Sequence, residues 1–179
     1  MKPKTESPTS KVQSPEVARL RADVSVLAFI ALGSNLGNSK ENILLGMRRL
    51  QELSDEPLLK SALWRTAPVD CPPGSPEFVN AVVALVPRRA ETPETLLRKL
   101  QALERDFGRE PKKFPNEPRP LDLDLIAFGH ETRATQELAL PHPRAHLRRF
   151  VLQPLSELAP ELILPGQRKT VAQFLAELP

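Results

Sequence analysis

The sequence is poor in cysteine and in aromatic residues, and it has no long hydrophobic run. Its one cysteine, Cys71, excludes an internal disulfide and a metal cluster built from cysteine alone, and a single thiol is typical of the reducing cytosol. With no Tyr, one Trp and seven Phe, the chain can hardly form a sheet surface on which several bases stack. No apolar stretch approaches the roughly 20 residues that cross a bilayer. We therefore expect a cytoplasmic protein that binds neither membranes nor nucleic acid.

The abundant residue types indicate one globular domain with stiff loops. Hydrophobic residues make up 40% and charged residues 26% of the 179, which is typical of a domain large enough to bury a core. The 20 prolines far exceed the roughly 5% of average usage. Because proline interrupts helices and central strands, long irregular loops are predicted. The formal net charge of +3 favours an anionic ligand.

The chain divides into a leader and a domain. Residues 1–23 are polar and lack apolar periodicity, so they predict a disordered leader, and residues 24–179 are expected to form the domain. The apolar run Val24–Leu32 has the length of a signal-peptide core. Acidic residues precede it, however, at Glu6, Glu16 and Asp23, and export signals normally avoid them. We interpret the run as a buried first strand.

Apolar periodicity predicts the order strand, helix, strand, strand, helix, strand. This order favours an α+β fold, in which helices pack on one face of a ferredoxin-like antiparallel sheet. Asn38 and Thr92 have the positions of helix N-caps. Two proline-rich loops, residues 67–76 and 109–120, are expected at the active site. The predicted strands are residues 24–32, 58–64, 78–86 and 121–128, and the predicted helices are residues 39–53, 93–107 and 171–178.

Two aspartates in the last predicted strand are candidate metal ligands. Asp122 and Asp124 alternate with leucines, so both carboxylates face the side of the strand that the leucines do not. Like charges on one face repel unless a cation lies between them, and hard oxygen ligands suit Mg²⁺, which also accepts phosphate oxygens. The alternative is a half-exposed strand without a metal. Because Asp is depleted in strands, we favour the Mg²⁺ site.

Basic residues in the flanking loops predict phosphate binding. Arginine binds phosphate oxygens in a bidentate manner and keeps its charge, so loops rich in arginine beside a Mg²⁺ site can hold a polyphosphate. His142 and His146 have the four-residue spacing of zinc ligands on a helix, but no third ligand is apparent. We therefore interpret a histidine here as a partner of phosphate or backbone. The basic residues are Arg109, Lys112, Lys113 and Arg119 in one loop and Arg144, Arg148 and Arg149 after the other.

A weaker pattern lies on the third predicted strand. Phe78 and Asn80 are two residues apart and share a face, beside the stiff loop of residues 67–76. An aromatic ring with an amide can hold a flat polar heterocycle. A phenylalanine in a strand is more often part of the core.

Four segments together resemble one enzyme family. They are IALGSNLGN at Ile30–Asn38, RTAPVD with PEFVNAV within Arg65–Val82, RPLDLDLIAFG at Arg119–Gly129 and PHPRAHLRRFVLQPL at Pro141–Leu155. The chain resembles 6-hydroxymethyl-7,8-dihydropterin pyrophosphokinases (HPPK) over about residues 26–178. That family transfers pyrophosphate from ATP to the hydroxymethyl group of the pterin, giving the pterin diphosphate and AMP in folate biosynthesis.

The resemblance also implies site residues and partners. ATP and the pterin are the expected partners, two Mg²⁺ ions are the expected cofactor, and a monomer is expected. Catalytic roles are implied for Arg109, Arg119, Asp122 and Asp124, of which the two aspartates hold the metal ions. The implied ATP-binding residues are Leu97, Gln101, Arg109, Lys112, Arg119, Leu125, Leu138, His142 and Arg148. The implied pterin-binding residues are Thr66, Ala67, Val69, Phe78, Asn80 and Phe150.

The sequence departs from the family pattern in one loop and one strand. Pro111 stands where many members have a second arginine, and Asn116 stands where a tryptophan is usual. Phe114 and Lys112 are candidates to replace the missing contacts. Phe78 stands where a tyrosine is frequent.

Two other functions remain compatible with the residues alone. A different Mg²⁺-dependent phosphate enzyme, a hydrolase or nucleotidyl transferase, would use the same aspartates and consume nucleotide without a pterin. An RNA-binding ferredoxin-like module would show affinity that falls steeply with salt, but it needs aromatic residues that this chain hardly supplies.

Overall fold

Five strands form an antiparallel sheet with ferredoxin-like strand order. The computed structural model describes residues 23–68, 71, 73–109 and 117–179, so nearly all of the predicted leader lies outside the described residues. The sheet order is β2-β4-β1-β5, and β3 pairs with β4 on the same edge as β2. The strands are β1 (Ala28–Ser34), β2 (Leu59–Lys60), β3 (Trp64–Thr66), β4 (Phe78–Leu85) and β5 (Asp122–Phe128).

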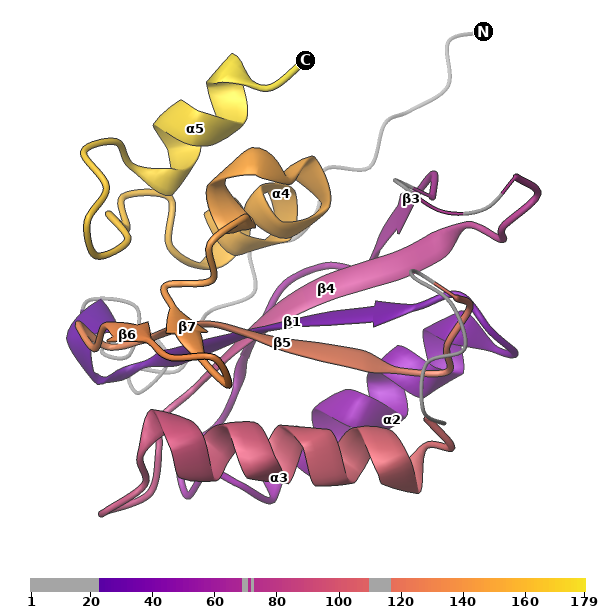
Figure 1. Ribbon diagram of the computed structural model, residues 1–179, viewed down its shortest axis with the longest axis horizontal. Helices are drawn as coiled ribbons and strands as arrows, with labels where there is room; N and C mark the ends of the chain where they lie inside the picture. Colours follow the sequence, from indigo (N-terminus) through magenta and orange to yellow (C-terminus); the bar gives the residue numbers. More distant parts are fainter. Residues whose placement is uncertain (1–22, 69–70, 72, 110–116) are drawn as a thin grey trace, which may run out of the picture.

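Helices cover both faces of the sheet (Figure 1). The two helices of the predicted order, α2 (Ser39–Gln51) and α3 (Pro93–Asp106), lie together on one face, as expected. On the other face lie α4 (Arg149–Leu158) and α5 (Val171–Glu177). The remaining elements are the 3-10 turns η1 (Val24–Val26) and η2 (Ala145–Leu147) and the hairpin strands β6 (Arg133–Ala134) and β7 (Ala139–Leu140). None of the helices in the described ranges has the length and hydrophobicity to cross a membrane.

The caps of α2 and α3 are confirmed. Asn38 Oδ1 accepts from the backbone N–H of Glu41, and Thr92 Oγ1 accepts from that of Thr95, which satisfies amides in the first turn of each helix. Pro93 occupies the first turn of α3, where its missing N–H costs nothing.

Two predicted strand boundaries are wrong. The first strand begins at Ala28 rather than Val24, because residues 24–26 form the 3-10 turn η1. The second predicted strand, residues 58–64, is two short strands, β2 and β3, which pair with separate parts of β4. Ser61 prolongs the pairing of β2 by donating its N–H to Val82, and the chain then leaves the sheet before Trp64.

The strands place apolar side chains under α4 and polar ones beyond it. On the face toward α4, Phe29, Val82 and Ile126 are buried in one cluster with the helix. Further along the same strands and on the same face, Asn80 and Asp122 follow at two-residue spacing. One end of this sheet face is therefore polar and is not covered by α4.

Candidate active site

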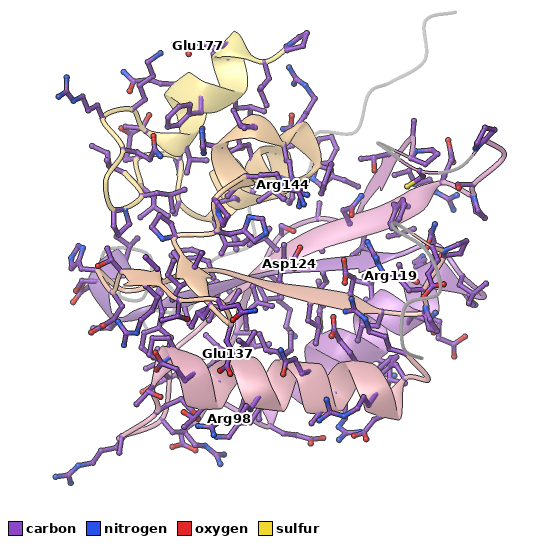
Figure 2. All side chains as sticks on the ribbon, viewed as in Figure 1. Arg98, Arg119, Asp124, Glu137, Arg144 and Glu177 are labelled. Carbon is purple, nitrogen blue, oxygen red and sulfur yellow. The ribbon has the colours of Figure 1, made fainter. Side chains whose placement is uncertain are left out.

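A pocket lies at the polar end of the sheet face. Its floor comes from β1, β4 and β5, and its walls come from the end of β3 and the start of α4. In Figure 2, Asp124 lies near the middle of the view above β5, and Arg119 lies toward the start of that strand. The lining residues are Ala31, Leu32, Gly33, Thr66, Ala67, Cys71, Phe78, Asn80, Arg119, Asp122, Asp124, Arg148 and Phe150.

Gly33 leaves the floor of the pocket open. It pairs with Asn80 on one side and with Asp122 on the other, so the three residues form a row across the sheet. A Cβ atom at position 33 would lie 3.2 Å from Asn80 Oδ1 and 3.9 Å from Asp122 Cβ. The absence of a side chain therefore provides room between an amide and a carboxylate.

Asp122 lies between two arginines. Its Oδ1 accepts from Arg109 Nη1 at 2.9 Å, and its Oδ2 lies 3.1 Å from Arg119 Nη2. The three side chains are 16–22% exposed, so the ion pairs are only partly screened by solvent. These two contacts, one on each carboxylate oxygen, fix the orientation of the Asp122 side chain.

Asp124 is less well neutralised than Asp122. The pair with Arg148 is long, at 4.0 Å between Nη1 and Oδ2. The pKa of the Asp124 carboxyl is raised, mainly because surrounding protein atoms displace water and also because Asp122 repels a second negative charge. About 39% of the side chain still faces solvent, so a cation has access to it. A bound cation would relieve this repulsion.

Glu104 is a buried carboxylate at the site that the sequence pattern did not predict. It projects from α3, is 5% exposed, and its Oε1 accepts from the backbone N–H of Leu123 at 2.8 Å and from Arg109 Nη1. Its carboxyl pKa is raised to about 7, chiefly by burial, with opposing contributions from the Leu123 hydrogen bond and Arg109. The signal was its place one turn after Leu100, on the buried face of α3.

Asn35 fixes the backbone of Arg119. Its Oδ1 accepts from the N–H of Arg119 at 2.9 Å, and its own N–H donates to the carbonyl of Arg119 at 3.2 Å. Asn35 is 3% exposed, and its Nδ2 and the Nε of Arg119 are buried with no hydrogen-bond partner among the residues that the structure describes.

A second pocket adjoins the first through Asp124. It lies against α3 and β7 and is mostly apolar, with His142 at its polar end. His142 Nδ1 accepts from the N–H of Arg144 at 3.2 Å, and burial lowers the pKa of the imidazole. The neutral ring therefore carries its proton on Nε2, which is free to act as a donor. The lining residues are Leu97, Leu123, Asp124, Leu125, Glu137, Leu138, Ala139, His142 and Pro143.

The other wall of the first pocket combines aromatic rings with amide and hydroxyl groups. Asn80 Nδ2 donates to Thr66 Oγ1 at 2.6 Å, which fixes the amide. The guanidinium of Arg119 lies 6.0 Å from the ring of Phe78, and that of Arg148 lies 5.4 Å from the ring of Phe150. Both rings are thus linked to the arginines near the aspartates.

Most predicted site residues come together in these two pockets. The first pocket gathers Thr66, Ala67, Phe78, Asn80, Arg119, Asp122, Asp124, Arg148 and Phe150, and the second gathers Leu97, Leu125, Leu138 and His142. Arg109 lies behind Asp122 rather than in a pocket wall. Gln101 is exposed one turn beyond Leu97 and lines neither pocket. Val69, the departures Pro111 and Asn116, and the basic or replacement residues Lys112, Lys113 and Phe114 fall outside the described residues.

The donor set at the two aspartates suits Mg²⁺. Both donors are hard carboxylate oxygens, and Asp124 bears a charge that its arginine only partly balances. Within the described ranges, no cluster of three or more His, Cys, Asp or Glu is arranged around a common point. His146 packs against Phe174, with ring centroids 5.4 Å apart. A magnesium ion here would take its other ligands from phosphate and water.

Comparisons with known proteins give a consistent result. Residues 29–160 match the family model described as 7,8-dihydro-6-hydroxymethylpterin-pyrophosphokinase (HPPK). Two proteins named 2-amino-4-hydroxy-6-hydroxymethyldihydropteridine pyrophosphokinase are similar along most of their length. The one from Haemophilus influenzae is 35% identical over 154 residues, covering 86% of this chain and 91% of the relative. The one from Pseudomonas aeruginosa is 38% identical over 152 residues, covering 84% and 91%.

A solved structure shares the fold. The crystal structure of Plasmodium falciparum HPPK-DHPS with pteroate superposes with a TM-score of 0.66 at 14% identity. The alignment covers 84% of this chain but 42% of that one, so the present chain corresponds to less than half of the longer protein.

Proposed function

Because the chain belongs to the 7,8-dihydro-6-hydroxymethylpterin-pyrophosphokinase (HPPK) family, we infer that it carries out the pyrophosphokinase step of folate biosynthesis. It transfers pyrophosphate from ATP to the hydroxymethyl group of 6-hydroxymethyl-7,8-dihydropterin and releases AMP. We assign this reaction to the two adjoining pockets. The observation that carries the assignment is that one pocket contains a carboxylate pair, two arginines and an amide with aromatic rings.

We propose that the triphosphate of ATP lies along the aspartates and arginines. Arg119 and Arg148 line the pocket, and each guanidinium can bind phosphate oxygens in a bidentate manner. Arg109 acts through Asp122, to which its Nη1 donates a hydrogen bond. The apolar pocket formed by Leu97, Leu125 and Leu138 is the place for adenosine, and His142 Nε2 can donate to a phosphate oxygen. Gln101 needs a side-chain movement to reach the nucleotide.

Asp122 and Asp124 would hold two Mg²⁺ ions together with phosphate oxygens. When bound, Mg²⁺ neutralises phosphate charge and orients the oxygens for displacement. Asp122 is already positioned by Arg109 and Arg119, so little ordering is required of it when ATP arrives.

The pterin is proposed to occupy the wall made by Thr66, Ala67, Phe78, Asn80 and Phe150. The fixed Asn80 amide offers a directional hydrogen bond to a flat heterocycle, and the two rings offer apolar faces. The hydroxymethyl oxygen would then attack the β-phosphorus of ATP as the bond to the α-phosphate oxygen breaks. Transfer of this kind depends on positioning and charge neutralisation more than on covalent help from the protein.

We also propose the boundaries of the domain, the oligomeric state of the protein and its location. Residues 24–179 are proposed to be the pyrophosphokinase domain, and the family match to residues 29–160 supports this. We propose a monomer, because one chain supplies the residues of both pockets. A cytoplasmic location without nucleic-acid partners is proposed from the single cysteine and the few aromatic residues.

Replacing either aspartate by its amide tests the assignment of the site. Asp122→Asn or Asp124→Asn removes a negative charge where cations and phosphate meet, so AMP formation with both substrates should fall by about a hundredfold or more. The fold should survive because both side chains border an open pocket. Asp106→Asn, on the exposed end of α3, is the matched control and should keep full activity. Normal turnover in both site variants would remove the basis for the assignment.

A further inference from the structure

Glu157 of α4 contacts β3, and both of these elements contribute residues to the first pocket. Glu157 lies near the end of α4. Both of its carboxylate oxygens accept hydrogen bonds from the region where β3 begins. Oε1 accepts from the indole Nε1–H of Trp64 at 2.8 Å, and Oε2 accepts from the backbone N–H of Ala62 at 2.7 Å. Glu157 itself is not part of the pocket lining.

The interruption between β2 and β3 explains why an acceptor is needed there. Ser61 still bonds to Val82 of β4, through its N–H and through its Oγ, and pairing with β4 resumes at Trp64 opposite Asn80. The N–H of Ala62 lies between these points, where the chain has left the ladder. A carboxylate on α4 replaces the missing strand partner for this group.

The connected elements carry residues of the proposed pterin wall. β3 has three residues, pairs with β4, and delivers Thr66 and Ala67 to the pocket. α4 delivers Phe150 at its first turn. A three-residue edge strand has few ladder hydrogen bonds to fix it, so its contact with α4 sets where Thr66 lies relative to Phe150.

We propose that Glu157 is a positioning residue for the pterin half of the site. By holding Trp64 and Ala62 against α4, it keeps the spacing between Thr66 and Phe150 that the pterin requires. This inference rests on the proposed function, since it takes the pocket wall to be the pterin site. The aspartates lie on β5 and the second pocket lies against α3, so the proposal predicts a loss of pterin affinity without a loss of nucleotide affinity.

Glu157→Gln tests this selectivity. The amide keeps one acceptor oxygen but turns an NH₂ group toward the other donor, so the tie to β3 weakens. The pterin Kd should rise about fivefold to tenfold, whereas the Kd of a non-hydrolysable ATP analogue with Mg²⁺ should change less than twofold. Glu161→Gln, an exposed position just after α4, is the matched control and should change neither Kd.

Trp64 provides a readout that does not depend on either ligand. It is the only tryptophan, so its indole N–H gives a single resonance in a nitrogen-15 correlation spectrum. That proton should exchange with water more slowly in the wild type than in Glu157→Gln. Trp64→Phe removes the indole donor and leaves the carboxylate intact, so it should raise the pterin Kd in the same direction by a smaller factor. If Glu157→Gln does not fold, the pterin Kd of Trp64→Phe tests the proposal in its place.

The measured Kd values distinguish a positioning role for Glu157 from a general structural role, and both from a failure of the proposed function. An unchanged pterin Kd in folded Glu157→Gln, or in Trp64→Phe, would overturn the proposal while leaving the proposed function in place. Equal weakening of pterin and nucleotide would show a general structural role and would also overturn it. A wild-type protein that binds no pterin would contradict the proposed function, and the inference would fail with it.

Discussion

At position 33, strand β1 carries a glycine between Asn80 of β4 and Asp122 of β5. These two neighbours belong to different halves of the proposed reaction, since Asn80 faces the pterin and Asp122 faces metal and phosphate. The reacting oxygen and phosphorus must meet between them. The size of residue 33 therefore controls how deeply the two substrates can enter, although the residue contributes no functional group.

Gly33→Ala should reduce pterin binding more than it reduces stability. The added Cβ would lie 3.2 Å from Asn80 Oδ1, so the amide must shift by a few tenths of an ångström away from β1, which disturbs its hydrogen bond with Thr66. We expect the pterin Kd to rise about tenfold, the loss of one directional hydrogen bond. The free energy of unfolding should change by less than about 1 kcal/mol, because alanine suits a strand better than glycine. Titration calorimetry and urea denaturation measure the two quantities. A pterin Kd equal to that of the wild type would show that the floor is not where the pterin binds.

Helix α3 and strand β5 are held together at the site by one buried carboxylate. β5 is at the edge of the sheet, so the outward N–H of Leu123 has no strand partner, and Glu104 of α3 accepts from it. The same oxygen accepts from Arg109, which in turn bonds to Asp122. The position of the aspartates thus depends on a helix that carries the proposed adenosine residue Leu97.

The raised pKa of Glu104 predicts a pH dependence of stability. Its carboxyl pKa is about 7 in the folded protein against 4.5 ordinarily, so the folded state holds its proton more tightly than the unfolded state does. The contribution of this group to the free energy of unfolding is therefore largest below pH 4.5 and falls as the pH rises to 7. The decrease is at most about 3 kcal/mol.

Urea denaturation at pH 5 and pH 7, with EDTA and without nucleotide, measures this decrease. Asp122 and Asp124 raise the Glu104 pKa and Arg109 lowers it. The proteins compared must therefore keep all three of these side chains. Glu104→Gln should show a smaller fall in stability between the two pH values than the wild type. Parallel behaviour of the two proteins would contradict the raised pKa.

The sequence predicts some elements better than others for physical reasons. β5 is well predicted because its leucines and aspartates alternate strictly, and α2 and α3 because their caps stand at the right spacing. The start of β1 is poorly predicted, because Val24 and Val26 are apolar but lie in a 3-10 turn, where Val26 is 44% exposed. The break between β2 and β3 is not predicted either, because the acceptor for the N–H of Ala62 is Glu157, which lies far away in the sequence.

The residues of the proposed site divide in the same way. Asp122, Asp124, Phe78 and Asn80 can be predicted because local alternation places them on one strand face. Glu104 and Glu157 escaped prediction because a single acidic residue in a helix is usually solvated, and only the packed structure shows which oxygen accepts from which backbone group.

At the scale of the whole molecule, the site exists because α4 covers only part of one sheet face. Helices α2 and α3 bury the opposite face, and α4 buries the apolar end of the near face. The uncovered end holds the aspartates, and the walls come from segments far apart in the sequence, β3 and the start of α4. The two pockets meet at Asp124, and in the proposed function the one against α3 takes the nucleotide and the one beside β3 takes the pterin.

In the proposed function, the protein cleaves ATP only to transfer pyrophosphate to a pterin. The most direct test is to measure AMP release from Mg²⁺-ATP with and without 6-hydroxymethyl-7,8-dihydropterin. We predict AMP only when the pterin is present, in equal amount with the pterin diphosphate. Cleavage of ATP at the same rate without the pterin would contradict the account and would make the site that of a phosphohydrolase.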